Sequence, residues 1–374
     1  MATPRTNTTI RDVAQLAKVS TATVSHVLHG RDERMAPKTR ERVLSAIREL
    51  RYRPTAFDSN VETTSRQLAF VLEEQGQHPT SNSYGTQLLD GVWETCSFAG
   101  WSVGLYIEKQ WDGAGGLIRR NFDGRCDGIV LIAPSIDSPA PRQFAERGLP
   151  LVLLGRERPM LGVCTVDINN EECAAELTRR MIALGHRRIA YVTTSPRQES
   201  SVLRATGFAR SAIESGIPLN GVRIFQREQV NADRVDQTVR EYIGDRFPVE
   251  TIVHTNEYSG NFAQQVFERF DAQHYLPTAI LCFNDDLVNN LNQVAQSRGI
   301  TDPRQLSWAG FDADPSIKID GRAITSVWQP LYEMGRAAAQ LILERCENPE
   351  LPNVNLQVSA RMVEGETLLP VLNP

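Results

Sequence analysis

Short apolar segments alternate with helix-like segments from Arg66 onward, and this alternation constrains the fold more than any other feature of the sequence. Strand-then-helix repetition predicts parallel sheets that are covered by helices on both faces. The strand-like segments are too numerous for one ordinary sheet, so we expect an α/β fold with two doubly wound lobes. The predicted strands are 68–73, 102–107, 127–133, 149–154, 163–168, 188–193, 222–225, 250–255, 278–283, 306–311 and 324–328, and the predicted helices are 84–99, 170–184, 199–215, 260–272, 285–298 and 331–346.

The segment 9–53 has a different texture and predicts three short amphipathic helices, because its apolar residues recur at helical spacing in three groups. Ser20 is placed to cap the second helix, and Pro37 suits the first position of the third, which needs no amide donor. The stretch 55–65 is polar, has no apolar period and is expected to be a hinge. The three groups are Ile10, Val13, Leu16 and Ala17, then Val24, Val27 and Leu28, then Val43, Leu44, Ile47 and Leu50.

Charge separates this all-helical head from the rest of the chain. The first 54 residues hold 11 of the 40 basic and 5 of the 45 acidic residues, so the head carries +6 and the remainder −11. A basic head on an acidic body indicates that the head is the part that meets a polyanion.

Several classes of protein are disfavoured by features that the sequence lacks. The start has no apolar run typical of a secretory signal, and no later run approaches the roughly 18 residues of a membrane helix. The six cysteines form no CxxC pair. No GxSxG, HExxH, Walker or GxGxxG motif points to an enzyme. We therefore expect a cytoplasmic protein with no disulfide framework, no metal site, no cofactor and no membrane partner.

The segment Thr9–Gly30 predicts two short helices around a tight turn, with small residues opening the second helix. A helix that enters the major groove needs a slim amino-terminal end so that its first residues touch base edges. Thr21, Ala22 and Ser25 provide such an end, and nearby basic side chains are suited to phosphate contacts. A head that binds protein is the alternative, but the basic excess favours DNA.

The same segment, TIRDVAQLAKVSTATVSHVLHG, closely resembles the DNA-binding head of the LacI/GalR family of bacterial transcription regulators. The usual family form runs TIxDVAxxAGVSxxTVSRVLN and is followed by YxPN. The resemblance implies a helix-turn-helix head, a hinge and a two-lobed core like periplasmic binding proteins of type I, with Thr21 and Ala22 reading bases. The residues in register are Thr9, Ile10, Asp12, Val13, Ala14, Ala17, Val19, Ser20, Thr23, Val24, Ser25, Val27, Leu28, Tyr52 and Pro54.

The second helix of the head departs from the family pattern, since His26 stands where Arg is usual, and His29 after it stands where Asn is usual. Arg grips a guanine edge with two donors, whereas a neutral imidazole offers one donor and one acceptor, so we expect a different operator sequence. Without a further ligand in the head, the two histidines are not expected to hold a metal. The expected DNA-contacting residues are Thr9, Arg11, Lys18, Ser20, Thr21, Ala22, Ser25, His26, His29, Arg40, Tyr52 and Val61.

The hinge also departs from the family, in which a leucine enters the minor groove. Asp58 replaces a small residue, Ser59 replaces an Arg, and Glu62 adds a second carboxylate. Negative charges beside phosphates oppose binding, so we expect weaker or differently shaped insertion. Val61 is the best candidate for the apolar wedge, and a plain flexible tether is the alternative.

Parallel sheets bind ligands beyond the carboxyl ends of their strands. Strand 278–283 runs into Asn284 and Asp285, and the resemblance implies that Asp285 accepts hydrogen bonds from effector hydroxyls, with a helix cap as the alternative. The resemblance also aligns Arg204 as a planar clamp on the effector, with a solvated helix residue as the alternative. The remaining expected effector residues are Asn284, Ser200, Asn256 and Tyr84, the last of which suits core packing equally well.

Asn169 and Asn170 follow a predicted strand and are assigned to turn chemistry rather than binding. The stretch 226–248 is an insertion relative to the family pattern and predicts an extra exposed helix. The expected domains are a head at 1–54, a hinge at 55–65 and an effector-binding core at 66–374, with lobe 1 at about 66–166 and 300–326 and lobe 2 at about 167–299 and 327–374.

The predicted function is that of a sequence-specific DNA-binding regulator, expected to be a repressor. A small polar effector, of the sugar, sugar-derivative or nucleoside class, would control its operator affinity allosterically. One small head makes few contacts, so a homodimer on a two-fold operator is expected. The alternative is a sugar-binding or sugar-processing protein whose head binds DNA only incidentally.

Overall fold

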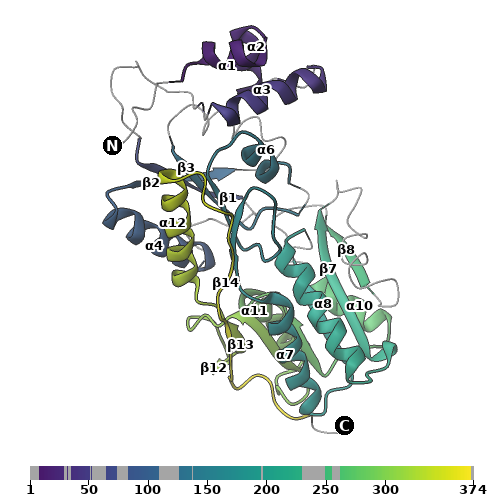
Figure 1. Ribbon diagram of the computed structural model, residues 1–374. Coiled ribbons are helices and arrows are strands. Elements are labelled where there is room, and N and C mark those ends of the chain that lie inside the picture. Colours follow the sequence, from purple (N-terminus) through teal and green to yellow (C-terminus); the bar gives the residue numbers. More distant parts are fainter. Residues whose placement is uncertain are drawn as a thin grey trace. The chain divides into compact units, whose positions relative to one another are not determined.

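The computed structural model describes residues 8–28, 32, 35–50, 52, 65–73, 83–108, 126–136, 138–194, 197–229, 249–254 and 262–371. The chain divides into two compact units, of which unit 1 comprises Met1–Val166 and Leu331–Leu356 and unit 2 comprises Asp167–Pro330 and Gln357–Pro374. Each unit is built around one main sheet (Figure 1). None of the described helices is both long enough and apolar enough to cross a bilayer.

The head consists of three helices, α1 (Ile10–Ala17), α2 (Thr21–Leu28) and α3 (Pro37–Glu49). They enclose a small apolar core in which Val13, Val24, Val27, Val43 and Ile47 are fully buried. Pro37 occupies the first turn of α3, where its missing amide proton costs nothing. The three helices expected from the apolar spacing are confirmed.

Unit 1 holds a six-stranded sheet in the order β14-β5-β4-β3-β1-β2. Strands β5, β4, β3, β1 and β2 pair in parallel. Every residue of β3 and β4 is buried, as expected for strands that are covered on both faces. The strands are β1 (Gln67–Glu73), β2 (Ser102–Glu108), β3 (Gly128–Ile132), β4 (Leu151–Leu154), β5 (Cys164–Asp167) and β14 (Asn355–Gln357).

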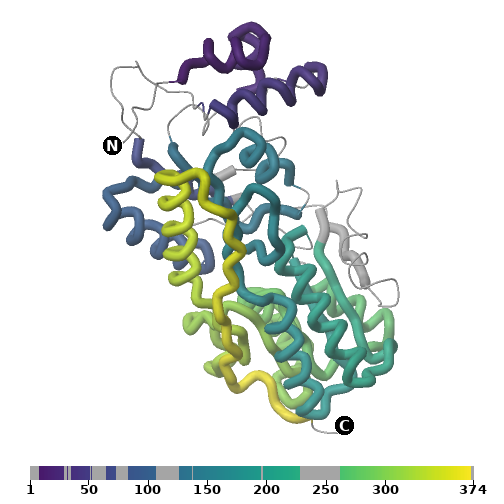
Figure 2. The backbone as a smooth tube through the Cα atoms, in the orientation of Figure 1, coloured from purple at the N-terminus to yellow at the C-terminus, as the bar shows by residue number. Residues whose placement is uncertain are grey.

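Helices α4 (Ser83–Phe98), α6 (Ala140–Glu146) and α12 (Leu331–Glu347) accompany this sheet. The returning segment that carries α12 lies beside α4 (Figure 2). The two helices approach so closely that a Cβ on Gly91 would lie 2.1 Å from the Tyr332 carbonyl oxygen, and a Cβ on Gly335 2.2 Å from that of Leu88. Glycine at both positions therefore permits backbone-to-backbone packing.

Unit 2 holds a seven-stranded sheet in the order β15-β13-β10-β9-β6-β7-β8, which is parallel from β13 to β8 and antiparallel at β15. Strands β11 (Lys318–Ile319) and β12 (Arg322–Ala323) form a separate hairpin. The sheet strands are β6 (Ile189–Thr193), β7 (Val222–Gln229), β8 (Val249–His254), β9 (Ala279–Cys282), β10 (Ser307–Asp312), β13 (Thr325–Trp328) and β15 (Arg361–Val363).

Four helices of unit 2 connect these strands, namely α7 (Asn170–Ala183), α8 (Glu199–Glu214), α10 (Phe262–Ala272) and α11 (Asp285–Ser297), and a short 3₁₀ turn, η2 (Leu219–Gly221), precedes β7. Helices α7 and α8 pack with almost no side chain between them at Gly207, where a Cβ would lie 2.0 Å from the Glu171 carbonyl oxygen. Phe225 of β7, Phe267 and Phe270 of α10, and Tyr275 form an aromatic cluster of the core.

All eleven predicted strands and all six predicted helices of the body are present. The expected assignment of segments to lobes was wrong in part. Segment 300–326 belongs to unit 2 because β10 pairs with β9, and residues 331–356 return to unit 1 because α12 packs on α4, β3 and β4. Of the predicted insertion 226–248, residues 226–229 belong to strand β7. Residues 230–248, most of the hinge, and residues His29, Val61 and Asn256 lie outside the described residues.

Candidate functional site

The first helix of the head begins with a reciprocal cap. The Asp12 carboxylate accepts hydrogen bonds from the Thr9 amide and hydroxyl, both at 2.7 Å, and the Thr9 hydroxyl accepts from the Asp12 amide at 3.3 Å. These bonds hold the pKa of Asp12 below its usual value. Thr9, an expected DNA contact, therefore also fixes the start of α1.

The second helix presents a slim, open amino terminus. The Ser20 hydroxyl accepts a hydrogen bond from the Thr23 amide at 3.1 Å, so the predicted cap is confirmed. Thr21, Ala22 and His26 are exposed, while Val24 and Val27 point into the core. Small exposed residues at the start of a well-anchored helix are what entry into the major groove requires.

The other expected DNA-contacting residues have varied environments. Lys18 ends α1 with a left-handed backbone, φ 53° and ψ 50°, a conformation that favours glycine. Arg40 is bound within the protein, with its Nε 2.7 Å from Asp32 Oδ2 and its Nη2 3.1 Å from Glu146 Oε2. Of the remaining members of the set, Arg11 and Ser20 are exposed and Ser25 and Tyr52 are half-buried.

In unit 2 the carboxyl ends of β6, β9, β10 and β13 share one edge because these strands are parallel. Polar side chains gather at this edge, as they do at the ligand sites of open α/β sheets. They include Thr193, Asp285, Asp312 and Gln329, together with Arg204 from α8.

Arg204 is buried within this edge, where it connects neighbouring segments, and is only 3% exposed. Its Nε donates to Asn170 Oδ1 at 2.9 Å and its Nη1 to the Phe283 carbonyl at 2.6 Å. The guanidinium lies over the Phe311 ring at 3.8 Å. Among the described residues Nη2 has no hydrogen-bond partner, so it is the nitrogen left to contact a ligand.

Asp285 is bound by the protein through both carboxylate oxygens. Its Oδ1 accepts from the Ser326 hydroxyl at 2.8 Å, and its Oδ2 accepts from the Asp314 amide at 3.1 Å. Burial and the nearby negative charge of Asp312 raise the pKa of Asp285 to about 8. With 1% of its surface exposed, Asp285 joins α11 to the ends of β10 and β13, and Asn284 supplies the cap of α11 at 3.0 Å from the Leu287 amide.

Sequence reasoning missed Asp312, which ends β10. Asp312 and the following Ala313 both have positive φ, at 97° and 49°, a strained backbone that tends to occur at ligand sites. Its Oδ1 accepts from Gln329 Nε2 at 2.7 Å. Burial raises the pKa of Asp312 to about 6, and the charge of Arg204 acts against that rise. The signal in the sequence was only a polar residue at the end of a predicted strand.

The remaining expected effector residues are placed as follows. Ser200 is 9% exposed in the first turn of α8. Tyr84 is half-buried on α4 of unit 1, with its hydroxyl close to Gly155. Asn169 caps α7, as the expected turn chemistry requires, whereas Asn170 is buried and bridges Asp167 Oδ2 and Arg204.

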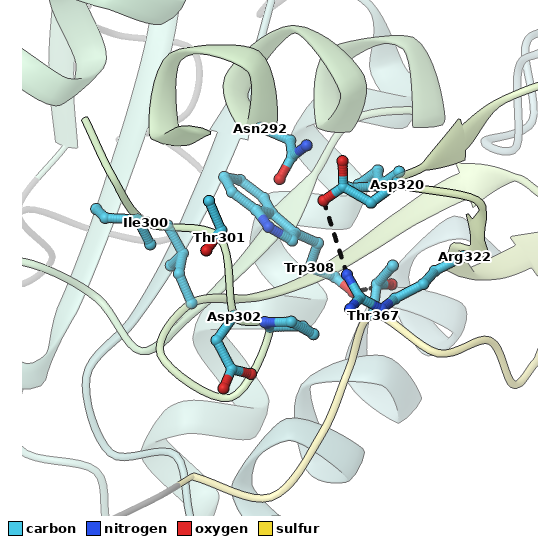
Figure 3. A pocket seen from close by; sticks show the side chains of 11 residues that line it. Asn292, Ile300, Thr301, Asp302, Trp308, Asp320, Arg322 and Thr367 are labelled. Atoms are coloured by element: carbon cyan, nitrogen blue, oxygen red, sulfur yellow. Dashed lines mark hydrogen bonds and ion pairs between the residues drawn. The ribbon is translucent and has the colours of Figure 1, made fainter. Parts of the chain in front are cut away.

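A separate small pocket lies near the start of β10, away from this edge. Figure 3 shows its lining, which includes Trp308, Asn292 and the ion pair of Asp320 with Arg322 at 3.7 Å. Its free volume of about 10 Å³ admits one water molecule and no sugar. Among the described residues, no three His, Cys, Asp or Glu side chains gather closely enough to hold a metal ion.

A capped helical head whose second helix begins with small exposed residues, together with two largely parallel sheets of which one carries polar side chains at its strand ends, defines a ligand-responsive DNA-binding regulator. Residues 9–55 match the model of bacterial regulatory proteins of the lacI family, and residues 178–368 match the periplasmic binding protein-like domain. The chain belongs to the lacI family of bacterial regulatory proteins.

Relatives with assigned names are transcriptional regulators. The HTH-type transcriptional repressor PurR of Vibrio parahaemolyticus is 26% identical over 349 residues, covering 91% of this chain and 93% of that protein. The regulator KdgR of Bacillus subtilis is 23% identical and covers 97% and 98%.

Two solved structures extend the comparison. The complex of the transcriptional regulator CelR with cellobiose has a TM-score of 0.64 at 25% identity, covering 96% of this chain and 99% of that one. The lac repressor dimer bound to operator and the anti-inducer ONPF has a TM-score of 0.62 at 19% identity, covering 97% and 100%, and supports the fold alone.

Proposed function

We propose that this regulator is a cytoplasmic, non-enzymatic repressor whose operator affinity is set by a neutral polyhydroxylated effector, bound at the carboxyl-end edge of unit 2. The observation that carries the proposal is the relation of Arg204 to Asp312. The charge of Arg204 acts to lower the pKa of Asp312, yet no ion pair within 4.0 Å joins the two side chains among the described residues. A ligand hydroxyl can bridge such a pair, because it accepts from a guanidinium and donates to a carboxylate.

The acidic surroundings of Arg204 favour a neutral effector over an anionic one. Asp285, Asp286 and Asp312 lie at the same edge, and burial together with the like charge of neighbouring carboxylates raises the pKa of Asp285 and Asp312. An effector carboxylate or phosphate here would meet carboxyl groups as well as one arginine. Cellobiose, which is bound in the CelR complex, is a ligand of the neutral, polyhydroxylated kind.

Thermal-shift measurements on the full chain test this proposal. The panel contains neutral mono- and disaccharides, sugar acids, nucleosides and purine bases. A neutral sugar is expected to raise the Tm, since binding to the folded state alone stabilises it, and Asp312→Asn is expected to abolish that rise. Stabilisation by purine bases or sugar acids only would refute the neutral-sugar assignment. Operator binding measured with and without the active sugar then shows whether it releases or recruits DNA.

We further propose that the head at 1–54 reads DNA through Thr21 and Ala22, with Ser25 and His26 beside them, while Arg11 and Lys18 contact phosphates. The assignment is supported by exposure of all these side chains except that of Ser25, which is half-buried. Arg40 must exchange its carboxylate partners for phosphate if it is to take part, because both Asp32 and Glu146 bind it in the absence of DNA.

A homodimer is proposed to form through the outer surface of unit 1. Trp93 and Phe98 on α4 are 61% and 87% exposed, and Leu105 on the edge strand β2 is 44% exposed. Neighbouring exposed apolar side chains of this size mark an association surface. Trp93→Lys with Phe98→Lys should yield monomers in light scattering after gel filtration. Leu161→Lys, which alters a side chain that is 97% exposed but lies in a loop, is the matched control.

A further inference from the structure

The end of helix α6 in unit 1 carries two charged residues that bind the head. Arg147 follows α6 and is only 2% exposed although it is an arginine. Its Nε and Nη2 donate to the carbonyl oxygen of Val27, at 3.4 and 3.2 Å, and its Nη1 donates to Gln143 of its own helix at 2.9 Å. Burying an arginine is costly unless its donors are satisfied, so these bonds fix where the guanidinium lies.

The Val27 carbonyl, which Arg147 binds, lies at the carboxyl end of a helix, where a positive charge is favourable. Val27 is the second-last residue of α2, and the last carbonyls of a helix lack partners within it and carry the negative end of the helix dipole. A guanidinium at this end satisfies a carbonyl and stabilises the dipole. Arg147 thereby holds the helix that carries the base-reading residues from the end opposite to Thr21 and Ala22.

Glu146 makes a second connection beside the first. Its Oε2 accepts from Arg40 of α3 at 3.1 Å, and Arg40 is also bound by Asp32. The other oxygen of Glu146 binds Arg142, which is 80% exposed and, among the described residues, makes no hydrogen bond or ion pair with the head. Between these polar contacts the apolar cores meet, because Val27 and Val43 of the head and Phe144 of α6 belong to one continuous buried cluster.

The docked head keeps its reading edge open. Thr21, Ala22 and His26 remain exposed while Val27 is held. A head covered by its own core would have lost this exposure. The contacts therefore orient the head instead of blocking it.

We propose that Glu146 and Arg147 form a docking surface in unit 1 that holds the recognition helix in the orientation in which it meets the operator. A head joined only by a tether must be ordered when it binds DNA, and that ordering lowers affinity. Docking removes part of this cost in advance. Arg147 and Glu146 are positioning residues, since neither is required to touch DNA.

The test compares three full-length variants. Arg147→Met removes both bonds to Val27 with little change in volume, and Glu146→Gln removes the ion pair to Arg40. Arg142→Gln is the matched control, because Arg142 pairs with the same Glu146 but lies outside the docking contacts described above. Hydrogen exchange of the free protein is followed in peptides from α2, α3, β3 and β4, and operator affinity is measured at several salt concentrations.

Arg147→Met should speed exchange in α2 by about tenfold and weaken operator binding by about tenfold, as expected for the loss of a charge-assisted bond. The slope of log affinity against log salt should stay within one unit of that of the parent, because no phosphate contact is lost. Glu146→Gln should speed exchange in α3 by about twofold to threefold, and Arg142→Gln should leave both helices unchanged.

Three outcomes would overturn the proposal. The first is exchange in α2 and α3 that is unchanged in both the Arg147→Met and Glu146→Gln variants. The second is tighter operator binding by Arg147→Met, which would make the docked head an inhibited state. If Arg147→Met also speeds exchange throughout β3 and β4, the substitution has loosened the whole lobe, and the Glu146→Gln variant then decides whether the head is docked. Unchanged exchange in α3 of Glu146→Gln is the third outcome that would overturn the proposal.

Discussion

Replacing Arg204 by Met separates two roles that the sequence could not distinguish, ligand contact and support of the sheet edge. The side chain makes two hydrogen bonds from a charged donor, at 2.9 Å to Asn170 and 2.6 Å to the Phe283 carbonyl, and Met removes both. Each such bond contributes about 1.5–3 kcal/mol, so the free energy of unfolding of unit 2 should fall by about 3–6 kcal/mol. A solvated arginine would cost almost nothing to replace.

Native-state hydrogen exchange provides the assay, because it reports each unit of a two-unit chain by itself. Peptides from β6, β9 and α8 should exchange about two to four orders of magnitude faster in Arg204→Met, whereas peptides from β1 and β3 of unit 1 should change little. Arg204→Lys keeps the charge and reaches one acceptor at most, so it should lie between Met and the parent.

Arg210 provides the matched control on the same helix. Its side chain is 38% exposed and pairs with Glu171 and Glu172 at the surface, so Arg210→Met should change exchange by less than tenfold. If Arg204→Met were as stable as Arg210→Met, Arg204 would have no structural role, and the interpretation that its hydrogen bonds support the sheet edge would be wrong. Loss of the sugar-induced thermal shift is expected in both Arg204 variants.

Three further predictions follow from single side chains. Asp285 has a pKa raised to about 8 in the folded chain, so its contribution to stability is full below about pH 4 and is lost as the pH rises toward 8. Asp285→Asn cannot ionise. The free energy of unfolding of this variant in urea, relative to that of the parent, should therefore rise by a few kcal/mol between pH 5 and 8. An unchanged difference across that range would contradict the assignment. Gly207→Ala places a Cβ 2.0 Å from the Glu171 carbonyl and should cost about 1–3 kcal/mol by thermal unfolding, while an equal Tm would show that α7 and α8 separate freely. Lys18→Gly relieves a left-handed backbone at the end of α1 and should stabilise the head by about 0.5–1 kcal/mol, yet it should reduce the salt slope of operator binding by about one if Lys18 contacts a phosphate.

The sequence predicted the elements well because each depends on a local pattern. Buried strands such as β3 and β4 are continuous apolar runs, and the helices of the body keep an apolar stripe. The missed strands β14 and β15 have three residues each with half-exposed centres, so no alternation distinguishes them from loops. Helix α6 has seven residues and begins after Pro139, which left too short a period to detect.

The arrangement of segments and of site contacts was less predictable because it depends on distant partners. Nothing near β10 in the sequence shows that it pairs with β9, so its lobe could not be assigned. Asp285 was expected to face the effector, but its partners Ser326 and Asp314 lie 41 and 29 residues away. Arg40 was expected to contact phosphate, and its partner Glu146 lies 106 residues away. Charge type and strand-end position identify a candidate residue, and only the fold shows which of its atoms are already bound.

These contacts also indicate where an effector signal would start. The chain passes from unit 1 to unit 2 at Asp167 and back before Leu331. Arg204 binds Asn170, whose amide binds Asp167, and Asp312 binds Gln329, two residues before the second passage. The chain passes into unit 2 a second time after Leu356. This third connection is hydrogen-bonded to the first, because the Val358 amide donates to the Asp167 carbonyl at 2.8 Å. Only one or two hydrogen bonds separate Arg204 and Asp312 from the segments that connect the units. An effector that pulls Arg204 toward Asp312 would therefore act on these segments directly. Coupling of this kind requires no long chain of contacts through the core, since the groups that would hold the ligand already hold the segments that join the two units.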